Sequence, residues 1–282
     1  MKASRSVVIL VGALVVSSAC SFETSLDALG TAPDASGVEP GHEQEPGVAA
    51  CKTPDANGLV VCLEFEDSTS DGVLDDSSPA RRNAQSTGMA LVPRSGTMVG
   101  SMAADVGDMA TTYVAQDAAL DLASGYTLAA WVKPDTLPAA SSARGVLDHE
   151  GQYAMIVSAT AIGSINNRCQ HTGVAKYEFT QRLPVGAWSF MACTWDGTEL
   201  CAWRWASATD HERYCHTPTL MPAETGAQGL AVGHLSSAGA AHNRFDGALD
   251  SVQVYSRGMS EAQLCALAGQ PAGCMPCDGT CI

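Results

Sequence analysis

Hydrophobic and polar residues alternate with the two-residue period of β-strands along much of the chain after residue 58. Five stretches show this alternation, or a short apolar run bounded by turn residues; they are residues 59–65, 126–133, 153–158, 188–195 and 248–255. The Asp196-Gly197 pair separates residues 188–195 from another apolar run at residues 198–205, which is typical of a β-hairpin. This part of the chain is therefore predicted to be all-β.

The period changes once, near the end of the chain. After a turn at Asp246-Gly247, strand alternation predicts one face with Ala248, Asp250, Val252 and Val254, and the other with Leu249, Ser251, Gln253 and Tyr255. Ser260 then suits a helix N-cap, and Gln263 three residues later completes a capping box. Asp250 is the unusual residue, because a carboxylate on an apolar face needs hydrogen-bond donors or a metal ion.

Three segments far apart in the sequence match motifs of one protein family. They are Phe245-Asp-Gly-Ala-Leu-Asp-Ser-Val-Gln-Val-Tyr-Ser-Arg, Tyr126-Thr-Leu-Ala-Ala-Trp-Val-Lys-Pro, and Gly186-Ala-Trp-Ser-Phe-Met-Ala-Cys-Thr-Trp-Asp-Gly. In order and spacing they resemble laminin-G-like, concanavalin A-like lectin/glucanase domains. The resemblance implies a jelly-roll sandwich of two antiparallel sheets with one short C-terminal helix. It also implies binding of carbohydrate or protein, often with calcium.

The N-terminal residues predict export and a lipid anchor. Residues 1–20 combine Lys2 and Arg5 with an apolar run too short to span a bilayer. The segment ends in Ser-Ser-Ala-Cys20, which resembles a bacterial lipobox with Cys20 as the lipidated residue; an ordinary signal peptide is the alternative. The expected location is the bacterial outer membrane or cell surface.

Composition divides the rest of the chain. Residues 21–50 hold acids, Pro and Gly without Lys or Arg and predict a disordered linker. Residues 51–270 form the predicted laminin-G-like domain, and residues 271–282 form a Cys-rich tail. The formal net charge of −15 disfavours nucleic-acid binding, which needs a basic surface.

The cysteine count predicts disulfides. Of 11 cysteines, ten remain after Cys20, enough for five bridges in an oxidising compartment. If Trp195 lies opposite Glu199 in the hairpin, Cys193 faces Cys201 at bonding distance. Proximity and elimination supply the remaining pairs, and disulfides are favoured over a zinc cluster in the tail. The predicted bridges are Cys51–Cys62, Cys193–Cys201, Cys169–Cys215, Cys265–Cys274 and Cys277–Cys281.

An acidic loop follows the first strand. Its carboxylates include Asp67 and Asp76, and oxygen ligands at this density suit calcium. Asp67, Asp76 and Asp250 are the candidate ligands of a structural calcium ion; the alternative is a solvated acidic loop. The EF-hand spacing is absent.

Neither catalytic motifs nor histidine pairs stand out. Glucanases of this fold carry spaced carboxylates on one strand, and no such array occurs, so an enzyme is not expected. The histidines lack helical partners and are interpreted as polar loop residues.

Aromatic residues indicate where a sugar could bind. Trp203 and Trp205 share a strand face, and with the neighbouring Arg204 they form the predicted ligand site. The sequence therefore predicts a non-catalytic, surface-anchored lectin-like lipoprotein that binds a polysaccharide or glycoprotein. The alternative is a protein-interaction or adhesion module without a sugar ligand.

Overall fold

The computed structural model describes residues 57–66, 71–94, 102–136, 138–140, 142–159, 165–171, 174–178, 183–207, 209–226 and 228–269. All of these residues belong to one compact unit. The predictions for residues 1–20, 21–50 and 271–282, including lipidation of Cys20, lie outside the described residues.

The described domain is built on two antiparallel sheets, with eight strands each among these residues. In the first, sheet A, the order is β14 (Asp210–His216), β13 (Leu200–Ser207), β12 (Ser189–Trp195), β7 (Tyr126–Pro134), β18 (Gly247–Tyr255), β5 (Met102–Val106) and β4 (Ala90–Pro93), with β1 (Leu59–Leu63) also paired to β18. The order in sheet B is β11 (Val174–Glu178), β10 (Ile165–His171), β9 (Tyr153–Ala159), β8 (Ala143–His149), β15 (Leu230–Val232), β6 (Thr111–Val114), β3 (Ala84–Thr87) and β2 (Val73–Leu74).

Three smaller elements complete the described fold. A hairpin of β16 (Leu235–Ser237) and β17 (Ala240–His242) packs near β8. A short 3₁₀ helix, η2, covers Ala118–Leu120, and α1 covers Glu261–Leu267. Ser260 N–H donates to Gln263 Oε1 at 3.0 Å, which confirms the predicted helix start. No described helix is long and apolar enough to cross a membrane.

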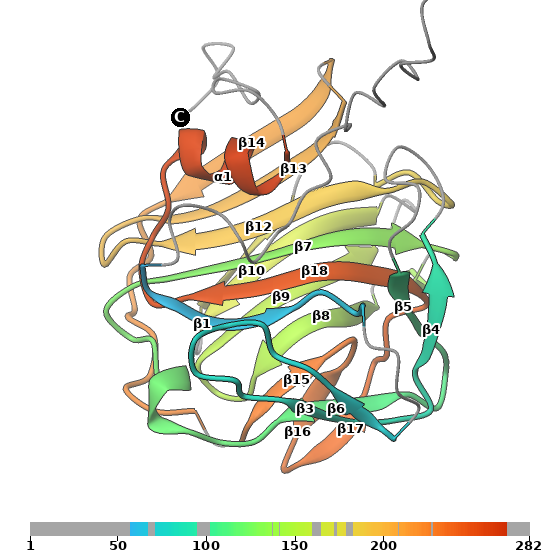
Figure 1. Cartoon of the computed structure of the whole chain (residues 1–282). Helices are drawn as coiled ribbons and strands as arrows, with labels where there is room; N and C mark the ends of the chain where they lie inside the picture. Colours follow the sequence, from blue (N-terminus) through green and yellow to red (C-terminus); the bar gives the residue numbers. More distant parts are fainter. Residues whose placement is uncertain are drawn as a thin grey trace, which may run out of the picture. The chain divides into compact units, whose positions relative to one another are not determined.

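Apolar side chains form two layers. The larger core lies between the sheets and includes Leu128, Met155 and Val254. A second cluster lies on the outer face of sheet A, where Leu264 and Leu267 of α1 cover the tryptophans. Figure 1 shows β7, β12 and β18 in front of β8–β10, with α1 beside β13 and β14. The predicted jelly-roll sandwich with a short C-terminal helix is confirmed.

A β-bulge in β18 changes the predicted face of Asp250. The register shifts between Asp250 and Gln253, and Ser251 has a positive φ of 49°. The bulge places one extra residue in the strand, so strict alternation across residues 248–255 was wrong. Val252 and Val254 face the core, whereas Asp250 lies opposite Trp131 on the outer face of sheet A.

The disulfides correct two predicted pairs, Cys193–Cys201 and Cys169–Cys215. The Asp196 carboxylate accepts from Thr198 N–H and Glu199 N–H, which draws Glu199 into the turn. Trp195 therefore pairs with Leu200 instead of Glu199. This one-residue shift sends Cys193 to the core and Cys201 to the outer face.

The observed bridges follow from that register. Cys193 bonds to Cys169 of β10 and ties the two sheets together, with Cα atoms 5.6 Å apart. Cys201 bonds to Cys215, which lies directly opposite it in β14. Cys62 and Cys265 are also disulfide-bonded. Their predicted partners Cys51 and Cys274, and the pair Cys277–Cys281, lie outside the described residues.

Candidate functional site

Strand β13 separates the three residues predicted to bind a ligand. Trp203 and Trp205 lie on the outer face of sheet A, because Cys201 and Trp203 belong to the outer cluster. Arg204 alternates to the opposite face, is fully buried, and pairs with Asp210. The predicted grouping of Arg204 with the tryptophans was therefore wrong, since neighbours in a strand point to opposite faces.

A depression of about 350 Å³ lies beside Trp203 on the outer face of sheet A. The indole N–H of Trp203 donates to Thr194 Oγ1 at 3.1 Å, and the Arg213 guanidinium lies 4.6 Å from the ring centroid. Trp203 is 2% exposed, so its ring offers no open platform. Gly258 closes one side, because a Cβ there would lie 2.9 Å from the Trp195 carbonyl.

A second arginine fills the same face of sheet A further along. The Arg94 guanidinium lies 4.5 Å from the Trp188 ring centroid and 5.0 Å from that of Trp131, and it pairs with Asp250. Burial raises the pKa of Asp250 to about 6, while Arg94 acts in the opposite direction. The donor that Asp250 needs is thus Arg94. The indole N–H groups of Trp131, Trp188 and Trp205 make no hydrogen bond.

The acids predicted to bind calcium have different roles where they are described. Asp76 accepts hydrogen bonds from Cys62 N–H, Ser78 N–H, the Ser78 hydroxyl and Arg82 N–H, at 2.6–2.9 Å. It thereby ties its loop to β1. Asp67 lies outside the described residues. Calcium therefore stays a prediction, and Asp76 and Asp250 already have protein donors.

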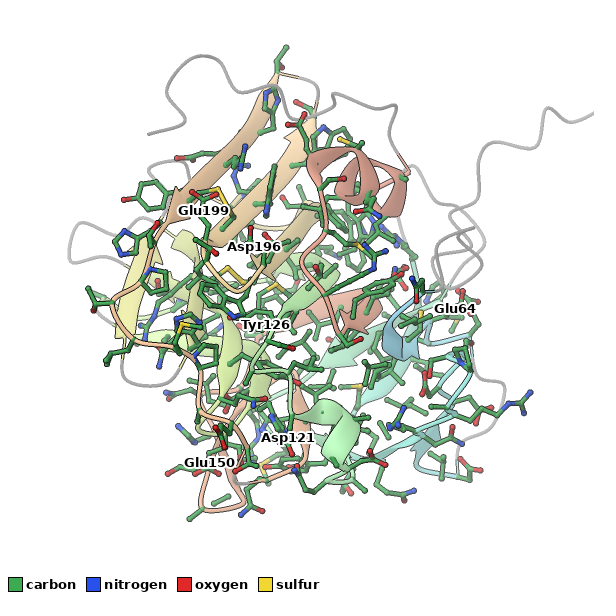
Figure 2. The ribbon with its side chains drawn as sticks, turned by 90° about the vertical axis from the view of Figure 1, so that its left-hand side faces the viewer. Glu64, Asp121, Tyr126, Glu150, Asp196 and Glu199 are labelled. Atoms are coloured by element: carbon green, nitrogen blue, oxygen red, sulfur yellow. A yellow bond between two sulfur atoms is a disulfide. The ribbon has the colours of Figure 1, made fainter. Side chains whose placement is uncertain are left out.

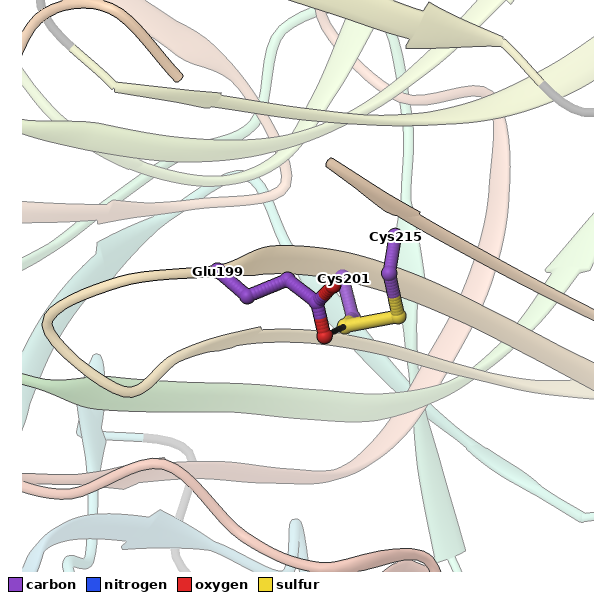
Figure 3. A group of neighbouring side chains, drawn as sticks. All are labelled: Glu199, Cys201 and Cys215. Carbon is purple, nitrogen blue, oxygen red and sulfur yellow. Dashed lines mark hydrogen bonds between the residues drawn. A yellow bond between two sulfur atoms is a disulfide. The ribbon is translucent and has the colours of Figure 1, made fainter. Parts of the chain in front are cut away.

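One group of possible metal-ligating atoms occurs in the described part of the chain, namely Glu199, Cys201 and Cys215. Figure 3 shows that the two sulfur atoms are bonded to each other. Arg213 also lies 3.8 Å from the Glu199 carboxylate. Sulfurs committed to a disulfide do not ligate as thiolates, so we assign no metal to this group.

A smaller polar cavity lies where β8, β9 and β10 end in sheet B. Its volume is about 140 Å³. We call it the His171 cavity; it is lined by Asp148, His149, Gly151, Gln152, Tyr153, Ala154, Gln170 and His171. In Figure 2, Glu150 and Asp121, which flank this region, lie well below Asp196 and Glu199 of the Trp203 depression.

His171 is the unusual group in this cavity. Its side chain is fully buried, and neither ring nitrogen has a hydrogen-bond partner. The backbone of Leu220 interacts with the ring and acts to raise its pKa, but the geometry is not that of a normal hydrogen bond. Burial lowers the pKa of His171, so the imidazole is neutral at pH 7. A buried polar group without a partner is costly, so His171 is the unusual group among the described lining residues.

The side chains on the opposite wall of the cavity form hydrogen bonds with other groups of the protein. Gln152 donates from its amide nitrogen to the carbonyls of Ala223 and Glu224, at 2.8 and 3.1 Å, so its amide oxygen is the acceptor that faces His149 Nδ1. His149 Nδ1 must therefore carry the proton. A Cβ at Gly226 would lie 2.1 Å from the His149 ring, so this loop packs directly on the cavity wall.

Asp148 also borders the cavity, but its side chain lies on the opposite face of sheet B from those of His149 and His171, next to the β16–β17 hairpin. It is 8% exposed, and its Oδ2 accepts from Ser236 N–H at 2.7 Å. Burial first, and then Glu150, raise the pKa of Asp148 to about 6, against the Ser236 bond and His242. The carboxylate is therefore mostly ionised at pH 7, and no oppositely charged side chain among the described residues forms an ion pair with it.

Sequence reasoning missed this cavity. His149 and His171 are buried at strand ends, so their interpretation as loop residues was wrong. The residues come from three strands, and no local spacing joins them.

The two antiparallel sheets and the short C-terminal helix are those of a concanavalin A-like β-sandwich. The family model for the concanavalin A-like lectin/glucanases superfamily (Laminin_G_3) matches residues 108–265, more than half of the chain. The chain belongs to this family. A search of curated proteins found no match.

Solved structures share the architecture. Domain 4 of AbnA, an extracellular arabinanase from Geobacillus stearothermophilus, in complex with arabinotriose, superposes with a TM-score of 0.56 and 16% identity, covering 74% of this chain and 98% of that one. The binding domain of Paraclostridial Mosquitocidal Protein 1 gives 0.54 and 12%, with 74% and 51% covered. The botulinum neurotoxin serotype D binding domain gives 0.50 and 10%, with 76% and 52% covered. This chain thus spans about half of each toxin chain, and these identities show the fold alone.

Proposed function

We propose that this protein is a non-catalytic carbohydrate-binding protein and that its sugar binds in the His171 cavity. The observation that carries the proposal is the fully buried His171 imidazole, whose two nitrogens have no hydrogen-bond partner. A sugar hydroxyl both donates and accepts, so it satisfies either nitrogen of a neutral imidazole. The sugar-bound arabinanase domain supports the ligand class.

The composition of the cavity argues against hydrolysis. Asp148 is the one carboxylate among the described lining residues. Glycosidases generally need two carboxyl groups on either side of the scissile bond, about 5–9.5 Å apart. A lone carboxylate beside neutral polar groups suits binding.

The disulfides support an exported protein. Cys169–Cys193 and Cys201–Cys215 require an oxidising compartment to persist. Attachment to the outer membrane or cell surface through a lipid on Cys20 remains part of the proposal and rests on the sequence pattern.

The test is a glycan and polysaccharide array with the oxidised protein and two histidine variants. We expect His171→Phe to abolish binding of whichever glycan the native protein retains. His234 is the matched control: it is also fully buried, but its ring nitrogens are already bonded to the backbone of Leu235 and Thr112. Folded His234→Phe should bind normally. Failure of the native protein to bind any glycan would overturn the proposal.

A protein ligand is the second candidate. Leu220 and Met221, 52% and 58% exposed, lie on the loop whose next residues bond to Gln152 at the cavity wall. Exposed apolar side chains beside a polar pocket also occur in protein-binding surfaces. If no glycan binds, loss of partner binding in a Leu220→Ser, Met221→Ser double variant would support this function.

A further inference from the structure

We propose that the Cys201–Cys215 disulfide is a site of thiol–disulfide exchange, where a small thiol from solution becomes bonded to Cys201. This site lies on the outer face of sheet A and is separate from the proposed sugar site. The Cys169–Cys193 bridge in the core is an internal reference that the same thiol does not reach while the protein is folded.

The two described disulfides differ in their access to solvent. Cys169 and Cys193 are fully buried between the sheets. Cys201 lines the depression beside Trp203, and Cys215 is half-buried in β14, the strand at the edge of sheet A. Exchange requires that a thiol approach the sulfur it attacks, so the depression gives a route to Cys201 that the core bridge lacks.

Two charged side chains make the sulfurs of this bridge unequal. Arg213 Nε donates to the Cys215 sulfur at 3.0 Å, and a Glu199 carboxylate oxygen lies 3.4 Å from the Cys201 sulfur. Figure 3 shows this carboxylate beside the bonded sulfurs. A guanidinium stabilises a thiolate, whereas a carboxylate destabilises one. Cys215 is therefore the better leaving group, and Cys201 is the sulfur that the thiol attacks.

The exchange step needs the thiol as its only other reactant. A thiolate, RS⁻, forms a bond to the Cys201 sulfur while the Cys201–Cys215 bond breaks, and the electron pair of the broken bond stays on Cys215. The thiol is thereby oxidised to a mixed disulfide, Cys215 is reduced, and the thiol proton passes to solvent. The new Cys215 thiolate lies beside the Arg213 guanidinium, which balances its charge.

The depression also selects the size and charge of the thiol. Its volume of about 350 Å³ is near the lower end of pockets for small molecules, about 300–1,000 Å³. The charged side chains in its lining are three acids and one base, namely Asp196, Glu199, Glu261 and Arg213. A small thiol with an ammonium group is therefore attracted, whereas a thiol with carboxylates is repelled, and salt should reduce the difference.

The experiment treats the folded, oxidised protein with a large excess of cysteamine, 2-mercaptoethanol or glutathione, followed by acid quenching and mass-spectrometric mapping of the cysteine peptides. We expect the adduct on Cys201 with a free thiol on Cys215, in about tenfold excess over the reverse adduct. Relative to an unstructured reference disulfide, cysteamine should react fastest and glutathione slowest. Cys169 and Cys193 should react only at the rate of global unfolding.

Three variants test the role of Arg213. Arg213→Met keeps an alkyl chain on the Trp203 ring and removes the charge, so exchange should slow about tenfold and the preference for Cys201 should weaken. Arg213→Lys should retain both the rate and the preference. Arg144→Met is the matched control, because Arg144 lies in β8 of sheet B and its side chain is 24% exposed, against 27% for Arg213. It should change neither.

Three results would overturn the proposal. An adduct on Cys215 would contradict the direction of exchange, and an unmodified Cys201 in the presence of all three thiols would contradict the site. Equal rates for Cys169 and Cys201 would show that both bridges react through unfolding. Sugar binding enters none of these measurements, so a failure of the proposed function leaves them unchanged.

Discussion

The outer face of sheet A and the His171 cavity treat buried polar groups differently. On sheet A, Arg94 is held between two indole rings and paired with Asp250, and Arg213 lies on Trp203 near Glu199. At the cavity, Asp148 accepts a hydrogen bond from one backbone N–H, that of Ser236, and the His171 ring makes no hydrogen bond of normal geometry within the described part of the chain. The charges on sheet A have their partners within the protein, whereas the His171 nitrogens are the candidate partners of a ligand. We therefore assign a structural role to the outer face of sheet A and a binding role to the His171 cavity.

The largest expected effect comes from breaking the Arg94–Asp250 ion pair on the outer face of sheet A. Asp250→Ala leaves the Arg94 guanidinium buried without its carboxylate, which should lower the free energy of unfolding by about 3–5 kcal/mol. Urea denaturation measures this loss. The double variant Arg94→Met, Asp250→Leu should recover most of it, because replacing both charges with apolar groups is often neutral. A small loss in the single variant would mean that the pair does not stabilise the fold.

The next effect concerns the bridge that connects the two regions. Replacing Cys169 and Cys193 with Ser should cost roughly 3–4 kcal/mol, because their 24-residue separation closes a long loop of the unfolded chain. Replacing Cys201 and Cys215, separated by 14 residues, should cost somewhat less. Non-reducing peptide mapping checks the pairing itself, and a Cys193–Cys201 peptide would contradict it.

Histidine substitutions sharpen the comparison directly. His171→Phe should leave the free energy of unfolding unchanged or slightly higher, because it removes a polar group that has no partner. His234→Phe should lower it by about 1–3 kcal/mol, because it strands Thr112 N–H and the Leu235 carbonyl. Thermal and urea unfolding of the two variants, measured side by side, test this reversal. Equal losses would show that His171 has a structural partner.

A smaller effect is expected from pH. The pKa of Asp148 is raised to about 6, so the carboxylate is ionised above that value and is protonated as the pH falls through it. This value lies above the usual pKa of an aspartate, so the folded state binds the proton more tightly than the unfolded chain, and the free energy of unfolding should rise as the pH falls from about 7 to about 4. Glu150 and His242 face the same carboxyl, and Asp148→Asn separates their contribution. A pH profile that is unchanged in this variant would assign the effect to another group.

The smallest effect is expected from removing calcium. The described lining of the His171 cavity contains one carboxylate, which is too few oxygen ligands for calcium. EDTA should leave sugar affinity unchanged. Loss of binding in EDTA would instead support a calcium ion at the acidic loop that influences the cavity.

The fold could be predicted from sequence because three local motifs each specify a strand or turn and occur in the family order. The motifs did not predict the strand register at two places where a single residue shifts it. The positive φ of Ser251 and the Asp196 side chain, which enlarges the hairpin turn, each shift a face by one position. Neither feature alters the alternation of residue types, so the faces of Asp250 and Cys201 were misassigned.

The site was less predictable than the fold. Trp203 and Trp205 were predicted to bind a ligand because large aromatic residues are rare and recognisable. In the structure, α1 and Arg213 pack on the face of sheet A that carries them. The cavity residues His149, Gln152 and His171 gain their meaning from burial and from the ends of three strands meeting. Only tertiary structure brings these together.

The Cys169–Cys193 bridge also has a mechanical consequence. A polypeptide extends by about 3.3–3.6 Å per residue, so the 24-residue separation withholds roughly 80 Å of chain from any pull on the ends. Tension passes through the sulfur–sulfur bond and bypasses the residues between the two cysteines. His171 is among them, two residues beyond Cys169. If the chain is stretched while a glycan is bound, the segment that contains His171 therefore carries no tension.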